Sequence, residues 1–367
     1  MSATRGKGRL SKIAVMAAGI LLSAAILAYL ILIHVSKLLV IGSHIEWRWA
    51  WLATACALGS YTMVGLALDE ALLILGYGLS FAELLGIALV STSVNYFVSS
   101  AGASGFALKA HLLRKRNVPY GATVTASVLT SAIIYIVLAV ILGQGFLYLF
   151  LHMRGARIAI MESALGLVLL VCAAVPFMVF FFNYRLRSRI FQSVFHWLNR
   201  AAYWFSRPGI PREEFAQFEQ QLNGGLERAR QSPKRLTMTV AYTCTDWLCA
   251  MTSLYCCFRA VGVNLSVGSL TAGFTAGQAA TLIPVLPGGL GAVEGSMAAV
   301  YQSLGLDWAT ALVAVFIYRI AYFIVPGLIS VFVFWGLKMS EPSLMKKAGR
   351  IEEQSDKGRS SPSPERC

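Results

Sequence analysis

The sequence predicts an all-α polytopic membrane protein with six transmembrane helices and two re-entrant helical hairpins, arranged as an inverted repeat. Of its 367 residues, 57% are hydrophobic and only 13% are charged, whereas soluble proteins carry about 25% charged residues. Apolar runs of about 20 residues, the length that crosses the hydrocarbon core of a bilayer, recur along the chain. Two stretches of glycine and small polar residues interrupt these runs, one in each half of the chain.

The first membrane half is predicted over residues 13–182, after a basic cytoplasmic N-terminus at 1–12. Its first apolar run is longer than the hydrophobic part of a signal peptide, so we expect a retained anchor. A second span begins near Trp47, where three tryptophans form an interfacial belt. Asp69 and Glu70 interrupt this span, and they either mark a helix end or face a cavity. The other spans of this half are expected at 13–33, 119–143 and 159–182.

Residues 80–116 are predicted to form a re-entrant hairpin. Ser80 and Glu83 fit a capping box, in which the two side chains satisfy free amides of the first helical turn. Small and polar residues then accumulate where a crossing helix would stay apolar, and a hairpin explains them better. The members of this segment that we consider as binding residues are Asn95, Gly102, Gly105 and Lys109.

A polar connector is predicted over residues 183–235 on the cytoplasmic side. Between Leu186 and Phe205, apolar residues recur at helical spacing with arginines between them. This pattern indicates a basic amphipathic helix, lying either on the membrane surface or on the protein's own cytoplasmic face. A second short helix near 211–230 is expected to be interrupted by the pair Gly224-Gly225.

The second membrane half is predicted over residues 236–337. Asp246 lies near the middle of one of its spans, and Arg319 lies near mid-depth in another. Ionisable residues at such depths are hypotheses for functional sites by default. The expected segments are spans at 236–258 and 308–337, a re-entrant region at 266–305, and a disordered cytoplasmic tail at 338–367.

The stretch PVLPGGLGAVEG at 284–295 predicts a helix that is broken inside the membrane. Its prolines lack an amide hydrogen, and its glycines adopt backbone angles that other residues avoid. Non-helical backbone at membrane depth is tolerated only where protein or a water-filled cavity covers it. Glu294 follows the break directly, which makes it a candidate for binding. The alternative is a surface loop between two helices.

An internal repeat with an offset of 186 residues relates the two glycine-rich regions, since Leu79-Ser80 aligns with Leu265-Ser266. Three predicted crossings lie between the copies, and an odd number places the second copy in the opposite orientation. Inverted repeats with broken helices are the layout of many transporters, with the binding site at the repeat interface. The aligned glycines are Gly102 with Gly288 and Gly105 with Gly291.

The basic residues predict an orientation with both termini in the cytoplasm. The four segments 1–12, 109–116, 183–235 and 338–367 contain 25 of the 31 Lys and Arg residues. This bias is what the positive-inside rule requires of cytoplasmic segments. We expect the membrane to be a bacterial inner membrane. The net charge of +14 is therefore a topology signal with some affinity for anionic lipid, and we expect no nucleic-acid partner.

The polar residues of the membrane region suggest binding more than catalysis. The sequence contains no nucleophile–base arrangement, no metal-ligand spacing and no phosphate-binding loop, so we expect no catalytic residues, no metal and no cofactor. Arg319 needs a compensating charge, for which Asp246 and Glu294 are the candidates. The pair is either purely structural, or Arg319 and the free amides of the broken helix receive an anionic phosphate.

Three segments resemble the lysylphosphatidylglycerol synthase transmembrane region, a flippase-like family. They are LPGGLGAVEG at 286–295, GLDWATALVAVFIYRIAYFIVPG at 305–327 and the earlier SSAGASGFALKAHLLRKRNVPYGATVTASVL. In two-domain relatives, this region moves aminoacylated phospholipid between leaflets and a separate domain makes that lipid. The separate domain is missing from this sequence, so we expect no synthase activity. Thr130-Ser131 occupies the place of Tyr318-Arg319 in the first copy, which disfavours any arrangement with an arginine in both halves.

The resemblance implies a protein that translocates or handles phospholipid. The alternatives are a membrane-embedded transferase, of the phosphatidylglycerol lysyltransferase or lipid-linked glycosyltransferase type, and an accessory subunit of a lipid synthase. The expected partners are an anionic or aminoacylated phospholipid and either a second copy or a lipid synthase. The candidate substrate-binding residues are Pro287, Gly288, Gly289, Gly291, Glu294, Arg319, Asp246, Asn95, Gly102, Gly105 and Lys109.

Overall fold

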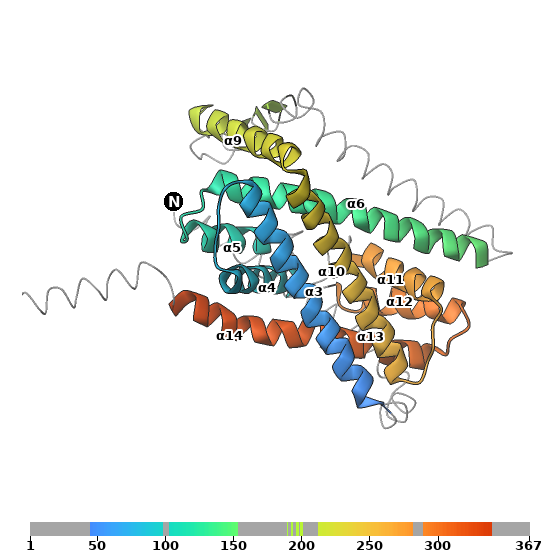
Figure 1. Ribbon diagram of the computed structural model, residues 1–367. Coiled ribbons are helices and arrows are strands. Elements are labelled where there is room, and N and C mark those ends of the chain that lie inside the picture. Colours follow the sequence, from blue (N-terminus) through green and yellow to red (C-terminus); the bar gives the residue numbers. More distant parts are fainter. Residues whose placement is uncertain are drawn as a thin grey trace, which may run out of the picture.

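The computed structural model describes residues 45–97, 103–152, 212–281 and 289–339, together with isolated positions between 189 and 200. These residues form mostly helices (Figure 1). Several predictions fall outside the described residues: the N-terminus, the spans at 13–33 and 159–182, most of the amphipathic helix after 185, and nearly all of the tail.

Three described helical stretches are long and apolar enough to cross a membrane. The first is α3 (Trp47–Ile74), the second lies in α6 (Tyr120–His152), and the third runs over Trp308–Leu337. The third combines α13 (Trp308–Arg319), the π-helical turn η2 (Ile320–Ile324) and α14 (Val325–Met339). The span expected at 236–258 corresponds to α10 (Pro233–Ala260), a 28-residue helix that is not among the three.

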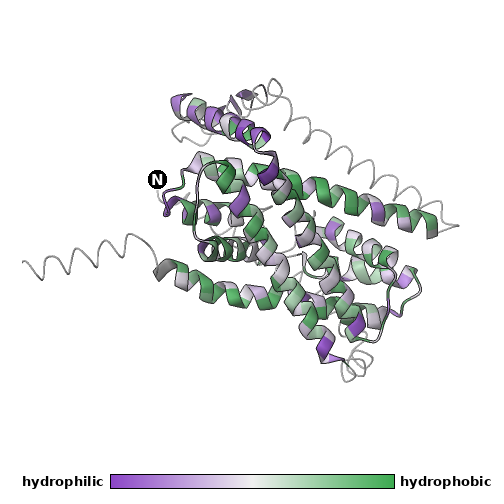
Figure 2. Ribbon diagram, in the orientation of Figure 1, coloured by the Kyte–Doolittle hydropathy of each residue, from purple (hydrophilic) through white to green (hydrophobic). Residues whose placement is uncertain are grey.

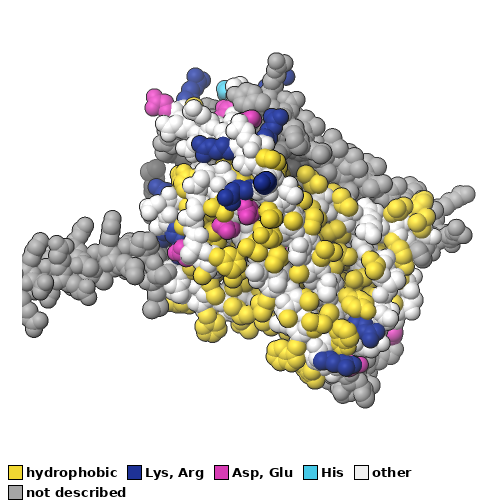
Figure 3. All heavy atoms as spheres, viewed as in Figure 1, with side chains coloured by type: hydrophobic (Ala, Val, Ile, Leu, Met, Phe, Trp, Pro, Cys, Tyr) yellow, Lys and Arg dark blue, Asp and Glu magenta, His cyan; other side chains and the backbone are white. Residues whose placement is uncertain are grey.

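The surface supports placement in a bilayer. Helices α6 and α14 are mostly hydrophobic along their length (Figure 2). On the face seen in Figure 3, charged side chains gather at two opposite ends and a broad hydrophobic area separates them. One side of α14 exposes apolar residues at helical spacing, which are Leu328, Val331, Phe332 and Trp335. Such a stripe is stable against lipid and would be costly in water.

Helices α3 and α10 pack against each other at the centre of the fold and run antiparallel (Figure 1). At one end, the amide of Glu46 donates to the carbonyl of Ala260 at 2.9 Å. At the other end, Arg235 Nη1 lies 3.0 Å from Glu70 Oε2. Helix α3 continues past Glu70 only to Ile74, which favours the helix-end interpretation of the acidic pair over the cavity.

The first predicted hairpin consists of α4 (Phe81–Phe97) and α5 (Ala103–Arg114), which pack together. Its base is held by Glu83, which accepts a hydrogen bond from Ser80 Oγ at 2.8 Å and pairs with Arg116 Nε at 3.0 Å. Gly105 brings the two helices close, because a Cβ at this position would lie 2.4 Å from the Ser91 carbonyl oxygen. The role of Gly105 that the structure displays is thus close packing.

The second hairpin consists of α11 (Val267–Thr281) and α12 (Ala292–Ser303). Ser266 Oγ accepts a hydrogen bond from the Ser269 amide at 3.2 Å at the start of α11. The buried Tyr301 ring of α12 packs over Gly273 of α11, and its hydroxyl donates to the Leu270 carbonyl at 3.2 Å. Burial of the whole aromatic ring with its hydroxyl satisfied fixes the two helices against each other.

The two halves follow the same helix order and exchange contacts. Helices α3 and α10 have equal length and are related by the offset of 186 residues, and each is followed by a hairpin and a long helix. Helix α6, which follows the first hairpin, packs against α11 of the second. Helix α14, which follows the second hairpin, packs against α4 of the first. Within the described residues, the last helix of each half therefore packs on the hairpin of the other half.

The connector differs from the sequence expectation at one point. Helix α9 (Arg212–Gln231) is continuous, so the predicted interruption at Gly224-Gly225 is wrong. A Cβ at Gly225 would lie 2.4 Å from Thr125 Cγ2 and 2.8 Å from Leu75 Cδ2. Glycine at this position allows α9 to approach α6 and the end of α3 closely. The helix stays continuous because a glycine in a helix interior costs only a modest amount of stability.

Candidate functional site

A buried ion pair joins two elements of the second half. Glu294 lies in the first turn of α12, and Arg319 is the last residue of α13. The Arg319 Nε atom lies 2.6 Å from Glu294 Oε1, and the side chains are 8% and 1% exposed, respectively. Of the two candidates for compensating Arg319, the structure thus selects Glu294. Burial of both charges is tolerable only because they are paired.

The backbone before α12 holds Glu294 in place. Its second oxygen, Oε2, accepts a hydrogen bond from the Gly291 amide at 2.7 Å. Gly289 and Gly291 have φ angles of 65° and 83°, which favour glycine because a Cβ would be strained there. The described end of the glycine-rich stretch therefore presents an amide to the carboxylate. Pro284, Pro287 and Gly288 lie outside the described residues.

Arg319 retains unused hydrogen-bonding capacity. Its guanidinium carbon lies 4.4 Å from the centroid of the Phe323 ring, as in a cation–π contact. Although Nε is close to Glu294, its N–H is not aligned for a hydrogen bond, and neither Nε nor Nη2 has a hydrogen-bond partner among the described residues. A Cβ at Gly289 would lie 3.8 Å from Nη2. The guanidinium therefore faces the end of the glycine-rich stretch with N–H groups left over.

The helix changes geometry directly after Arg319. In the π-helical turn η2, the Val325 amide donates to the Ile320 carbonyl, one residue further back than in an α-helix. Pro326 has no amide hydrogen and so is no partner for the Tyr322 carbonyl. That carbonyl instead accepts a hydrogen bond from Tyr61 Oη of α3 at 3.1 Å. Turns of this kind are frequent at functional sites.

Asp246 lies next to this turn but is not paired with Arg319. Ser60 Oγ of α3 donates a hydrogen bond to Asp246 Oδ1, and the same Oγ lies 2.7 Å from Tyr322 Oη. The Tyr322 ring packs 5.3 Å from that of Phe323, which covers Arg319. Asp246 is thus linked to the Arg319–Glu294 pair through Ser60 and the aromatic residues of η2.

The candidates from the first hairpin are more distant from this cluster. Asn95 is exposed on α4, although its neighbour Tyr96 packs 4.7 Å from the Phe323 ring. Lys109 on α5 forms no ion pair with a described acidic residue. Gly102 lies outside the described residues. Of the predicted residues, the structure brings Gly289, Gly291, Glu294 and Arg319 together and places Asp246 beside them.

A family comparison agrees with the resemblance seen in the sequence. The model of the lysylphosphatidylglycerol synthase TM region matches residues 16–330. The chain belongs to this family. It is similar to a UPF0104 membrane protein of Methanothermobacter thermautotrophicus, with 29% identity over 43% of this chain and 47% of that protein. It is also similar to phosphatidylglycerol lysyltransferase of Staphylococcus aureus MRSA252, with 33% identity over 24% of this chain. The matches span less than half of the first relative and 10% of the second.

This member of the lysylphosphatidylglycerol synthase TM family contains site residues that the sequence analysis missed. Ser60, Tyr61, Tyr322 and Phe323 complete the cluster around Asp246 and Arg319. Two signals in the sequence pointed to them. The repeat offset of 186 residues pairs Ser60 with Asp246, and Pro326 follows Arg319 closely enough to disturb the helix between them.

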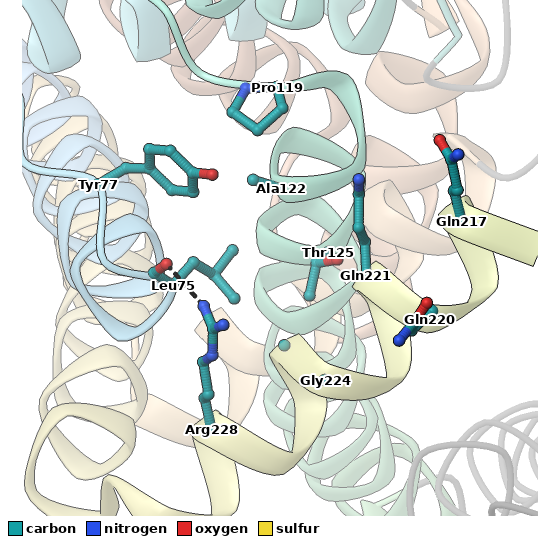
Figure 4. Close-up of a pocket in the computed structure, with 11 residues that line it drawn as sticks. Leu75, Tyr77, Pro119, Ala122, Thr125, Gln217, Gln220, Gln221, Gly224 and Arg228 are labelled. Atoms are coloured by element: carbon teal, nitrogen blue, oxygen red, sulfur yellow. Dashed lines mark hydrogen bonds between the residues drawn. The ribbon is translucent and has the colours of Figure 1, made fainter. Parts of the chain in front are cut away.

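A separate polar cleft of about 450 Å³ lies where α9 meets α6 and the end of α3 (Figure 4). The Tyr77 hydroxyl points into it, and Arg228 Nη1 donates to the Leu75 carbonyl at 3.1 Å at its edge. Gln221 stands against Gly121, since a Cβ there would lie 1.7 Å from Gln221 Oε1. The cleft involves none of the predicted site residues, and its hydrogen-bonding groups hold the connector to the membrane helices.

Proposed function

We propose that this protein translocates a phospholipid between leaflets and that Arg319 receives the lipid phosphate. The observation that carries this proposal is the buried guanidinium of Arg319, with Nε and Nη2 lacking hydrogen-bond partners among the described residues. A guanidinium presents several N–H groups in a planar fork that matches phosphate geometry. Gly289 lies next to this group, since a Cβ at this position would lie 3.8 Å from Nη2.

In this proposal, the carboxylate of Glu294 occupies the place of the lipid phosphate beside Arg319 when no lipid is bound. This carboxylate neutralises Arg319 in the absence of lipid, at an N···O distance of 2.6 Å. An arriving phosphate competes for the same guanidinium and frees Glu294 to bind a cationic group of the headgroup. A zwitterionic or aminoacylated headgroup, with an ammonium beside its phosphate, satisfies both charges at once, which keeps the buried site neutral.

The membrane layout of the proposal has six spans, two re-entrant hairpins and an inverted repeat, with both termini in the cytoplasm of a bacterium. The antiparallel packing of α3 and α10 and the exchanged packing of α6 and α14 support the inversion. In this layout, the second hairpin brings Glu294 to the repeat interface, where transporters bind their substrates. The acyl chains remain in the surrounding bilayer.

Purified protein in liposomes with fluorescent anionic, zwitterionic and aminoacylated phospholipids tests the proposal. We expect headgroup-selective exchange between leaflets without covalent change. Arg319→Lys keeps the charge but loses the planar fork, and we expect at least tenfold slower exchange with the protein still folded. Arg48→Lys is the matched control, because Arg48 is 78% exposed and pairs with Glu46 at the same 2.6 Å distance. Equal exchange by Arg319→Lys and the wild type would contradict the assignment of the phosphate.

The same liposomes distinguish the second candidate function, that of a phosphatidylglycerol lysyltransferase, which the similarity to the staphylococcal lysyltransferase favours. An enzyme of this type would convert phosphatidylglycerol into a new lipid when an aminoacyl donor is added. Thin-layer chromatography of the extracted lipid detects such a product. Formation of a product would show a transferase in place of a translocator. The absence of both product and lipid exchange would favour an accessory subunit.

A further inference from the structure

We propose that Asp246 is a proton-binding site and that its charge controls the Arg319 site through Ser60 and Tyr322. The proton-binding step stands on the geometry of α3, α10 and η2. The control of lipid movement rests on the function proposed above.

Asp246 has no opposite charge within reach. It lies near the middle of α10 and is partly buried. None of the basic residues described in the structure lies within ion-pair distance of it, and Arg319 is taken by Glu294. An unpaired carboxylate at membrane depth is costly, and binding a proton removes that cost.

The surrounding titratable groups do not replace a countercharge. Those that face Asp246 are Tyr61 of α3, Tyr96 of α4, Tyr322 of η2 and Cys249 of α10, and each is neutral unless it loses a proton. Helix α11 contains no acidic or basic side chain, α13 contains only Arg319, and α6 has only His152 at its end. Among these groups, only Arg319 carries a positive charge, and it pairs with Glu294. Apart from Asp246, the charged residues of α3 and α10 themselves lie toward the ends of these helices.

The direction of the hydrogen bonds follows from the single hydroxyl hydrogen of Ser60. Ser60 Oγ donates to Asp246 Oδ1, so Tyr322 Oη must donate to Ser60 Oγ across their 2.7 Å contact. A protonated Asp246 is a donor, and the chain then reverses: Asp246 donates to Ser60, and Ser60 donates to Tyr322. The Tyr322 hydroxyl then no longer donates to Ser60, and its hydrogen can be donated to another acceptor.

This reversal occurs at the turn that carries the anion site. Tyr322 lies in η2 directly after Arg319, its carbonyl is held by Tyr61, and its ring packs against Phe323 under the guanidinium. Ser60 and Asp246 occupy equivalent positions of the two halves, since they are separated by the repeat offset of 186 residues. Proton binding therefore acts at a contact between equivalent positions of α3 and α10.

Infrared difference spectroscopy between acidic and neutral buffer tests proton binding without any lipid transport. We expect wild-type protein in nanodiscs to gain a carbonyl band of a protonated carboxylic acid on acidification, and Asp246→Asn to lack it. Asp69→Asn is the control, because Asp69 lies at the end of α3 outside this cluster. A band that survives in Asp246→Asn, or an Asp246 band that does not change with pH, would overturn the proposal.

Ser60→Ala provides a second variant that keeps the carboxylate. It removes a donor to the charged form, so we expect the midpoint of the band to move to higher pH by about one unit. A midpoint that stays in place, with the protein monodisperse on size exclusion, would contradict the assigned hydrogen bond.

Lipid exchange under a pH gradient tests the coupling. We expect the gradient to change the exchange rate of the wild type and of Asp69→Asn at least threefold, and to leave the rate of Asp246→Asn unchanged. A gradient response in Asp246→Asn would overturn the coupling. Absence of lipid exchange in every sample would refute the translocation function. The infrared experiment would still test proton binding by Asp246, because it does not depend on lipid exchange.

Discussion

At the residue scale, two ion pairs with the same N···O distance of 2.6 Å contribute differently to stability because their burial differs. Arg319–Glu294 is almost fully buried, whereas Arg48–Glu46 is 78% and 46% exposed. Water screens the exposed pair, which contributes at most about 1 kcal/mol. The buried pair has no solvent to replace a missing partner, so the loss of one partner leaves the other charge uncompensated between the hairpin and the last span.

Glu294→Gln should therefore destabilise the protein by about 3–5 kcal/mol, because it leaves Arg319 as an uncompensated buried charge. Thermal unfolding in detergent measures the change. Glu46→Gln is the matched control and should change stability by less than about 1 kcal/mol. The double variant Glu294→Gln/Arg319→Gln should recover much of the loss, since it removes both charges. Equal effects of the two single variants would show that the buried pair does not hold the fold.

At the element scale, the π-helical turn depends on an exchange of hydrogen-bond partners. Pro326 provides no amide for the Tyr322 carbonyl, and Tyr61 of α3 supplies the donor at 3.1 Å. One proline thus positions the aromatic residues of the site and links the last span to α3. The sequence analysis located Arg319 but not this turn, because the donor comes from a helix more than two hundred residues earlier.

A double-mutant cycle tests this exchange. Tyr61→Phe should cost about 1–3 kcal/mol, because it leaves the buried Tyr322 carbonyl without its donor. Pro326→Ala restores an amide at the position that an α-helix uses for the same carbonyl, so Tyr61→Phe should cost less in that background. Urea unfolding of the four proteins gives the coupling energy. Additive costs would mean that Tyr61 and Pro326 act independently.

The sequence predicts those elements that depend on neighbouring residues in the chain, and it does not predict those that depend on contacts between distant helices. The capped start at Ser266, the positive φ angles of Gly289 and Gly291 before Glu294, and the span carrying Arg319 follow from local patterns, and the structure contains them. At Ser80 the structure shows a hydrogen bond between the Ser80 and Glu83 side chains. The supposed interruption at Gly225 failed because the glycine serves a contact with Thr125 of another helix. The partner of Arg319 was left between Asp246 and Glu294, since only the packing of α12 against α13 decides it.

At the scale of the whole molecule, the offset of 186 residues relates α3 to α10, and the two helices run antiparallel. Each long helix after a hairpin packs on the hairpin of the other half. The two halves nevertheless differ at the site, because Thr130-Ser131 stands where the second half has Tyr318-Arg319. Both charges of the buried pair, Glu294 and Arg319, therefore belong to the second half.

This arrangement predicts opposite accessibility for the two ends of the central helix pair. Glu46 precedes α3 at one end, and Gly224 lies on α9 beside the other end, exposed and with no atom within 4 Å of its would-be Cβ. In a background without native cysteines, Glu46→Cys should react with an impermeant maleimide from the outside of intact cells. Gly224→Cys should react only in inverted vesicles if the basic connector is cytoplasmic, as the positive-inside rule predicts. Labelling of both positions from the same side would contradict a crossing by α3 and α10, and reversed labelling would place the connector outside.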